Sequence, residues 1–164
     1  MSPRAAWRLE SLGFGQVYDY TAGKLDWMAA GLPTAGTNAG RPQAGDLARK
    51  DPPTCGLNER LGEVRDRVRA RGWDVAVVVN EERVVLGMLR ARELDADNDR
   101  TVEQVMRPGP STFRPFVPAE EMARFMTEHR LESSPITTAD GRLVGLLFQE
   151  DVVEHVASQR DRAS

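Results

Sequence analysis

The feature that most constrains the fold of this chain is an internal repeat. When the sequence is aligned with itself at an offset of 58 residues, Gly87 falls on Gly145 and Glu93 falls on Asp151 without a gap. The same offset matches five further pairs: Pro52 with Pro110, Thr54 with Thr112, Val64 with Met122, Val68 with Met126, and Val78 with Ile136. Matches at one fixed period indicate a structural unit used twice, so both copies are expected to share one fold.

Each copy predicts the order strand, helix, strand, strand, helix. An extended piece begins at Thr54 or Thr112, and a helix with apolar residues at helical spacing follows it. The apolar positions are Leu57, Leu61, Val64 and Val68 in the first copy, and Ala119, Met122, Phe125 and Met126 in the second. Two strands come next, "DVAVVVN" and "VVLGML" in one copy and "SSPITTA" and "LVGLLF" in the other. A closing helix begins near Glu93 or Asp151, and the predicted fold class is therefore α+β.

The composition narrows the function classes. The chain has 164 residues, of which 40% are hydrophobic and 29% charged, as is typical of a soluble globular protein. Its formal charge of -3 gives no general attraction to a nucleic acid polymer or to an anionic membrane. No apolar run is long enough to span a bilayer, and "MSPRAAWRLE" is not ordered like a signal peptide, so we expect a cytoplasmic protein. Because Cys55, His129 and His155 stand apart in sequence, no metal site is expected.

The repeated residues resemble a tandem pair of cystathionine-β-synthase (CBS) domains. The resemblance rests on "VVVN" and "PITTADG", on "VVLGMLRAREL" and "LVGLLFQEDVV", and on the lead-in "TVEQVMRPGPSTF", and it covers roughly residues 51–156. It implies two β-α-β-β-α units packed sheet to sheet around a pseudo-twofold axis. It also implies two clefts that bind an adenosine-containing ligand such as AMP, ATP or S-adenosylmethionine, and a homodimer. Such a module is regulatory and requires no cofactor.

The family's site signature is a glycine, a hydroxyl residue three positions later for phosphate, and an acid six positions later for the ribose hydroxyls. In this chain the acids are Glu93 and Asp151, but Arg90 and Phe148 stand at the hydroxyl positions. The acids serve equally well as helix caps, and Arg90 is either a phosphate ligand or a solvated arginine. If the acids hold ribose, the Glu93 cleft should prefer AMP or ATP, and the Asp151 cleft an uncharged or sulfonium ligand.

Other positions are expected, from the resemblance, to contact the adenine ring. They are Thr54, Val77, Val78, Thr112, Pro135 and Ile136. Apolar residues in strands are also ordinary core residues, so this second interpretation stays open.

The N-terminal stretch resembles the last third of a rhodanese domain. A helix capped by Ser2 should end at Gly13, followed by the strand "QVYDY" and a short helix that contains Trp27 and ends at Gly31. The pattern "GF..VY.Y..GK.DW.AAGLP" carries the resemblance. In that family the catalytic cysteine lies in a loop just before the first of these helices, and that loop is absent here, so no enzymatic activity is expected. Either the coding sequence starts upstream, which we favour, or the remnant docks elsewhere.

These interpretations divide the chain into five parts: a rhodanese remnant over 1–33, a flexible linker over 34–50, the first CBS repeat over 51–100, the second over 101–157, and a frayed tail over 158–164. The favoured function is a non-catalytic regulatory protein that senses an adenosine-containing ligand. Two alternatives stay open: a fragment of a rhodanese-type sulfurtransferase with a regulatory CBS pair, and a CBS pair used only for dimeric assembly. The helix with Met122, Phe125 and Met126 suggests excess apolar surface for a homodimer.

Overall fold

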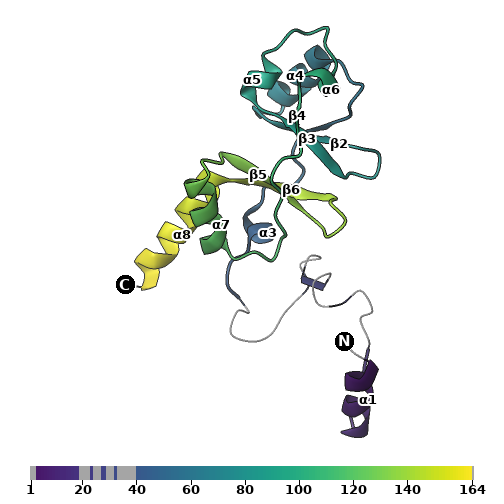
Figure 1. Ribbon diagram of the computed structural model, residues 1–164. Helices are drawn as coiled ribbons and strands as arrows, with labels where there is room; N and C mark the ends of the chain where they lie inside the picture. The colour runs from purple at the N-terminus through teal and green to yellow at the C-terminus, as the bar shows by residue number, and fades with distance from the viewer. Residues whose placement is uncertain (1–2, 19–22, 24–26, 29–31, 33–39, 164) are drawn as a thin grey trace.

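The computed structural model describes residues 3–18, 23, 27–28, 32 and 40–163 (Figure 1). Helix α1 spans Pro3–Ser11, and Gly13 follows it with a φ of 92°, as expected for a glycine that ends a helix. Residues 16–18 are not in a strand. The rest of the predicted "QVYDY" strand and most of the short helix around Trp27 lie outside the described residues. The rhodanese resemblance therefore stays a prediction.

The predicted order of elements is confirmed in the first copy and, from its first helix onward, in the second. The first copy comprises β1 (Thr54–Cys55), α4 (Leu61–Ala70), β2 (Ala76–Val79), β3 (Val85–Leu89) and α5 (Ala91–Leu94). The second comprises α7 (Ala119–Glu128), β5 (Ser133–Thr137), β6 (Leu143–Phe148) and α8 (Gln149–Ala163). The extended piece near Thr112 is reduced to one parallel bridge between Phe113 and Ile136, the positions equivalent to Cys55 and Val78, which also pair in parallel.

The two copies differ most in their closing helices. Helix α5 ends at Leu94, whereas α8 continues to Ala163, so the residues predicted to be a frayed tail are helical through 163. Helix α8 packs against α7, and its C-terminal end extends beyond α7 (Figure 1). The apolar residues Val152 and Val156 supply its buried side, which explains why the helix persists beyond its first turns.

The segment that leads into each repeat packs against the other repeat. The upstream crossing segment, residues 43–50, contains α3 (Ala44–Leu47) and bridges the second repeat at Pro118 and Leu146. The downstream crossing segment, residues 101–108, contains α6 (Val102–Val105) and β4 (Arg107–Pro108), which pairs with β3. The two segments are related by the same offset of 58 residues as the repeats.

The upstream crossing segment corrects the last part of the linker expected over 34–50, whose residues 34–39 lie outside the described residues. Ala44 is fully buried and Ala48 nearly so, both in the core of the second repeat with Met122 and Met126. Leu47 packs against the same core, and these three apolar positions have helical spacing, but the helix that they form spans only four residues, too few for a clear signal in the sequence. Helix α3 is therefore stabilised by its buried contacts with the second repeat, which lies far away in the sequence.

The signature glycines have a structural cause. A Cβ atom on Gly87 would lie 2.7 Å from the Met106 sulfur and 2.9 Å from the Arg107 carbonyl oxygen. A Cβ atom on Gly145 would lie 2.9 Å from the Arg49 carbonyl oxygen and 3.1 Å from the Ala48 Cβ. Each glycine therefore allows the backbone of a crossing segment to approach the strand closely.

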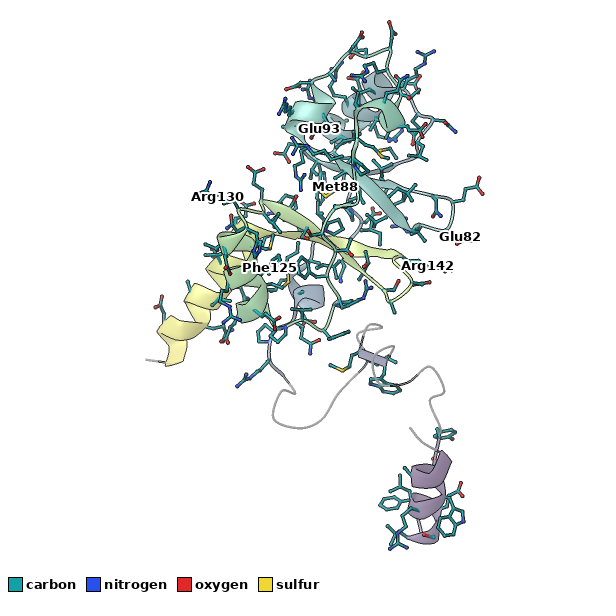
Figure 2. All side chains as sticks on the ribbon, in the orientation of Figure 1. Glu82, Met88, Glu93, Phe125, Arg130 and Arg142 are labelled. Atoms are coloured by element: carbon teal, nitrogen blue, oxygen red, sulfur yellow. The ribbon has the colours of Figure 1, made fainter. Side chains whose placement is uncertain are left out.

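The sheets of the two repeats face each other across a third buried cluster. Val77 and Met88 come from the first repeat, and Leu143 and Leu146 from the second (Figure 2 labels Met88 between the repeats). The helix residues Met122 and Met126 are instead fully buried inside the second repeat.

The helix that carries Met122, Phe125 and Met126 exposes less apolar surface than the sequence suggested. Phe125 packs between Phe113 and His129, with ring centroids 5.0 and 4.0 Å away, respectively. Because Met122 and Met126 are buried as well, the apolar surface that suggested a homodimer is mostly covered by the chain itself.

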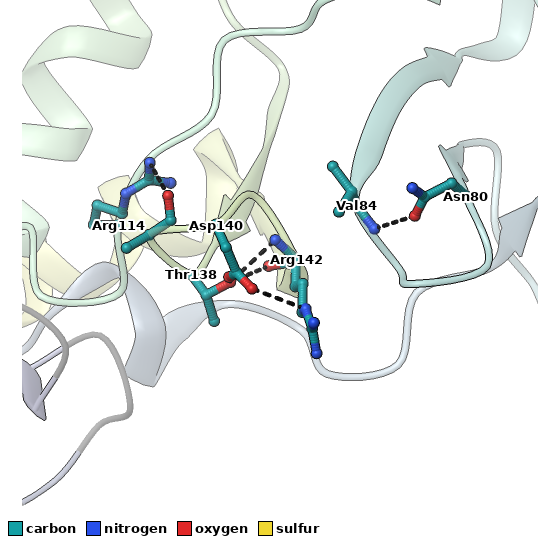
Figure 3. A network of polar contacts seen from close by, with 7 residues as sticks. Asn80, Val84, Arg114, Thr138, Asp140 and Arg142 are labelled. Atoms are coloured by element: carbon teal, nitrogen blue, oxygen red, sulfur yellow. Dashed lines mark hydrogen bonds and ion pairs between the residues drawn. The ribbon is translucent and has the colours of Figure 1, made fainter. Parts of the chain in front are cut away.

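The two β-hairpins join at one end of this interface, and Figure 3 shows their turns, with Val84 in one and Arg142 in the other. The Leu143 N–H donates to the Arg83 carbonyl at 2.9 Å, and the Val85 N–H donates to the Gly141 carbonyl at 3.0 Å. Residues 83 and 141 are repeat equivalents, as are 85 and 143, so the two hydrogen bonds are exchanged by a local twofold axis. The axis passes near Val84 and Arg142, which pair with each other.

Candidate functional site

A cleft of about 830 Å³ lies between the repeats, at the end of the interface opposite the paired hairpins. Its walls come from the starts of β2 and β5 and from the ends of β3 and β6. Its lining includes the aromatic and charged side chains of Arg49, Trp73, Asp74, Arg90, Glu132, Phe148 and Glu150. Both repeats and the upstream crossing segment thus contribute to a single cavity.

Aromatic side chains from the two repeats form one wall. The ring centroids of Trp73 and Phe148 are 5.8 Å apart, with an angle of 46° between the planes. The Arg49 guanidinium lies 4.2 Å from the Phe148 ring centroid, in a cation–π contact. The wall therefore offers apolar ring surface with a positive charge beside it.

Asp151, one of the two predicted ribose ligands, is held by Arg49. The Arg49 Nε and Nη2 atoms donate to the two carboxylate oxygens at 2.7 and 2.8 Å, and Nη2 also donates to Glu150 at 2.8 Å. Hydrogen bonding to Asp151 raises the pKa of Arg49 above its ordinary value. The carboxylate lies in the first turn of α8, as expected, but its two oxygens already have donors.

Glu93, the other predicted ribose ligand, also accepts hydrogen bonds from groups of the chain itself. Its carboxylate accepts a hydrogen bond from Arg107 Nε at 2.7 Å and from the Arg90 backbone N–H at 3.1 Å. Burial favours the neutral acid, but the bonds from Arg107 and the Arg90 backbone outweigh it and hold the pKa of Glu93 below its usual value. Glu93 therefore caps α5, and Figure 2 shows it on the first repeat, away from Met88 at the interface.

Arg90 reaches the same cleft as Phe148, although the sequence analysis assigned them to separate clefts. Arg90 is half-buried, and its guanidinium donates a weak hydrogen bond to the Met88 sulfur at 3.9 Å. Among the described residues, Arg90 has no carboxylate partner. An arginine without a counterion in a cleft is suited to bind an anionic group.

The residues predicted to contact adenine lie elsewhere. Val77, Val78 and Ile136 are fully buried in the core, and Pro135 is buried within β5. Thr54 is half-buried in β1, where its carbonyl accepts from Arg67 at 3.3 Å, and Thr112 is exposed. The apolar side chains of this set are therefore core residues, and the contacts with adenine stay a prediction.

Sequence reasoning missed Trp73, Asp74 and Glu132 as cleft residues. A signal was present, because Asp74 and Glu132 are related by the offset of 58 residues, with Asp74 at the start of the predicted strand "DVAVVVN" and Glu132 directly before "SSPITTA". Arg49 and Arg107 form a second such pair, equally absent from the predicted site.

Cys55 is buried in the core of the first repeat, with only 2% of its surface exposed. Desolvation raises the pKa of its thiol to about 12. The described residues contain no group of three or more His, Cys, Asp or Glu side chains placed to hold a metal ion. No helix in the described part of the chain combines the length and apolar character needed to cross a bilayer.

Comparison with known proteins identifies the repeats. A sequence model of the CBS domain matches residues 44–95 and 102–158, which together make up well over half of the chain. The chain belongs to the CBS domain family. The first matched range begins in the upstream crossing segment, and the second begins in the downstream one, so each CBS repeat includes the lead-in that packs on its partner.

The CBS pair has both sequence and structural relatives. The magnesium transporter MgtE of Thermus thermophilus is 33% identical over 78 residues, which cover 47% of this chain and 17% of the transporter. A crystal structure of the CBS domain pair of protein MJ0100, in complex with 5'-methylthioadenosine and S-adenosyl-L-methionine, superposes with a TM-score of 0.65 at 20% identity, over 73% of this chain and 98% of that one.

A second solved structure resembles the CBS pair at higher identity. It is the cytosolic domain of the magnesium channel MgtE in complex with ATP, with a TM-score of 0.64 and 28% identity. The match covers 70% of this chain and 48% of that domain. The CBS pair therefore spans less than half the length of each of these magnesium-transport relatives.

Proposed function

We propose that this CBS pair is a non-catalytic regulatory module that binds an adenosine-containing ligand in the cleft between its repeats. The cleft itself carries the proposal, because it combines an aromatic wall, the unpaired guanidinium of Arg90, and Arg49 bound to the signature acid Asp151. Solved relatives in complex with S-adenosyl-L-methionine and with ATP support it. In this arrangement Asp151 accepts the ribose hydroxyls, and Trp73 and Phe148 offer their faces to the adenine ring.

The charges of the cleft favour one class of adenosyl ligand. Arg49 and Arg90 face three carboxylates, those of Asp74, Glu132 and Glu150. Such a lining repels a triphosphate more strongly than it repels a monophosphate, and it attracts a sulfonium cation. We therefore place S-adenosylmethionine first, AMP second and ATP last.

Thermal unfolding in the presence of each ligand tests the proposal. At about 100 times the dissociation constant, a bound ligand stabilises the folded state by roughly 2.7 kcal/mol. For a chain of this size we expect a rise in Tm on the order of 2–4 °C per kcal/mol. The Asp151→Ala variant should lose this shift. Asp95→Ala, which removes an exposed carboxylate paired with Arg69 on the first repeat, should keep it.

One observation favours a second function, a CBS pair used only for dimeric assembly. Both signature acids are already paired with arginines of the chain, Glu93 with Arg107 and Asp151 with Arg49. If millimolar S-adenosylmethionine, AMP and ATP all leave the Tm unchanged, the sensing function is wrong and this second function replaces it.

The sulfurtransferase alternative leads to a separate expected result. Persulfide chemistry needs a thiolate, and the buried Cys55 thiol, with a pKa of about 12, is protonated at neutral pH. We expect this chain to form no thiocyanate from thiosulfate and cyanide. Activity that persists in Cys55→Ser would contradict the non-catalytic proposal, and activity lost in that variant would show that Cys55 is reactive.

A further inference from the structure

We infer that Arg49 is an internal competitor for the ligand's ribose, and that ligand binding loosens the upstream crossing segment from the second repeat. The inference rests on the function proposed above and adds a mode of regulation to it. It connects the state of the cleft with the chain that precedes residue 43.

The first step concerns two donors that share one acceptor. Arg49 presents two N–H donors to the two oxygens of Asp151, at 2.7 and 2.8 Å. A ribose diol presents two O–H donors with a similar fork geometry to the same edge of a carboxylate. Since the guanidinium already fills that edge, the diol and Arg49 exclude each other at Asp151.

The second step concerns what else Arg49 holds. Its guanidinium also binds Glu150 and lies against the Phe148 ring, so displacement breaks contacts with three residues of the second repeat. The Arg49 backbone is bonded to β6 in both directions, since its N–H donates to Leu146 at 2.8 Å and its carbonyl accepts from Leu146 at 3.0 Å. Because this side chain anchors the end of the segment, its release weakens the adjacent backbone pairing.

The third step concerns the equivalent pair on the other side of the pseudo-twofold axis. Arg107 binds Glu93 at 2.7 Å, and neither residue of this pair lines the large cleft, whereas Arg49 of the other pair lines it and Asp151 directly follows the lining residue Glu150. Glu93 is only 8% exposed and also caps α5. The ion pair between Arg107 and Glu93 therefore has a structural role, and only Arg49 competes with the ribose of a ligand.

Calorimetric titration with adenosine tests the competition. Adenosine carries the ribose diol without a phosphate, so removal of Arg49 costs it no phosphate contact. We expect Arg49→Gln to bind adenosine with a dissociation constant about two- to fivefold lower than that of the wild type, the size of a partly exposed ion pair. Arg69→Gln removes an arginine from an ion pair remote from the cleft, so it should bind like the wild type.

Two results would overturn the inference. Equal or weaker adenosine binding by Arg49→Gln would show that Arg49 does not compete, while the proposed function would stand. No binding of adenosine, AMP or S-adenosylmethionine by either protein would remove the proposed function and this inference together.

Hydrogen exchange gives a readout in the unaltered protein. Saturating adenosine should speed exchange of the Arg49 and Leu146 amides severalfold, because their mutual bonds loosen. The Gly109 amide, which donates to Leu86 just after the downstream crossing segment, should be unchanged. Exchange at Arg49 that slows or stays constant while adenosine is bound would contradict the release of the segment.

Discussion

Replacing Leu146 by alanine is expected to lower the free energy of unfolding by about 2–5 kcal/mol, the largest effect that we predict. Leu146 is fully buried between the facing sheets with Val77 and Met88 of the other repeat. Its backbone also exchanges two hydrogen bonds with Arg49. Truncation removes apolar contacts and leaves a cavity where both repeats and a crossing segment meet. Urea denaturation followed by circular dichroism measures the change.

A matched variant separates this effect from general sensitivity to truncation. Val153 on α8 has 42% of its surface exposed, so Val153→Ala should change stability by about 0.5 kcal/mol or less. If the two substitutions cost the same, the facing sheets contribute little and the arrangement of the repeats described here is wrong. A second transition at low urea in Leu146→Ala would show instead that the repeats unfold separately.

Gly145→Ala is expected to destabilise the protein by about 1–3 kcal/mol, even though the substitution adds a single methyl group. The new Cβ would lie 2.9 Å from the Arg49 carbonyl oxygen, and backbone cannot move aside as a side chain can. The upstream crossing segment must therefore shift away from β6. The melting temperature should fall, and the amide protons of Arg49 and Leu146 should exchange with solvent faster.

Gly56→Ala is the control for this substitution. A Cβ on Gly56 would meet only the Glu59 carboxylate oxygen, at an ordinary 3.8 Å. We expect little change, or a small gain because alanine reduces the entropy of the unfolded chain. A Gly145→Ala protein as stable as Gly56→Ala would mean that the crossing segment does not pack over β6 as described.

The fold of the two repeats was predictable because its information is local and present twice. The strands "VVLGML" and "LVGLLF" are apolar runs of strand length, and the Asp140-Gly141 turn permits a positive φ, observed as 84°. Where the secondary-structure signal of one copy is weak, the equivalent residues of the other copy, 58 positions away, supply it. The same offset, applied upstream, places Ala44 on Val102 and would have indicated that residues 43–50 mirror α6.

The site was predictable only in part, for a physical reason. Glu93 and Asp151 were identified because their spacing from the glycines is short and regular. Their partners Arg107 and Arg49 come from segments that cross to the other repeat, and no periodicity in the sequence indicates that crossing. The aromatic contact between Trp73 and Phe148 joins the two repeats, and it is set by how the sheets face each other.

The reciprocal crossing of residues 43–50 and 101–108 has a consequence for how this architecture arose and how it unfolds. If a single ancestral unit carried its own lead-in, two copies of it would have assembled by domain swapping, each lending its lead-in to the other. Gene fusion of such a pair yields the present order of elements without moving any of them. Because each half is completed only by the other, neither is an autonomous folding unit, and the pair should fold as one cooperative whole.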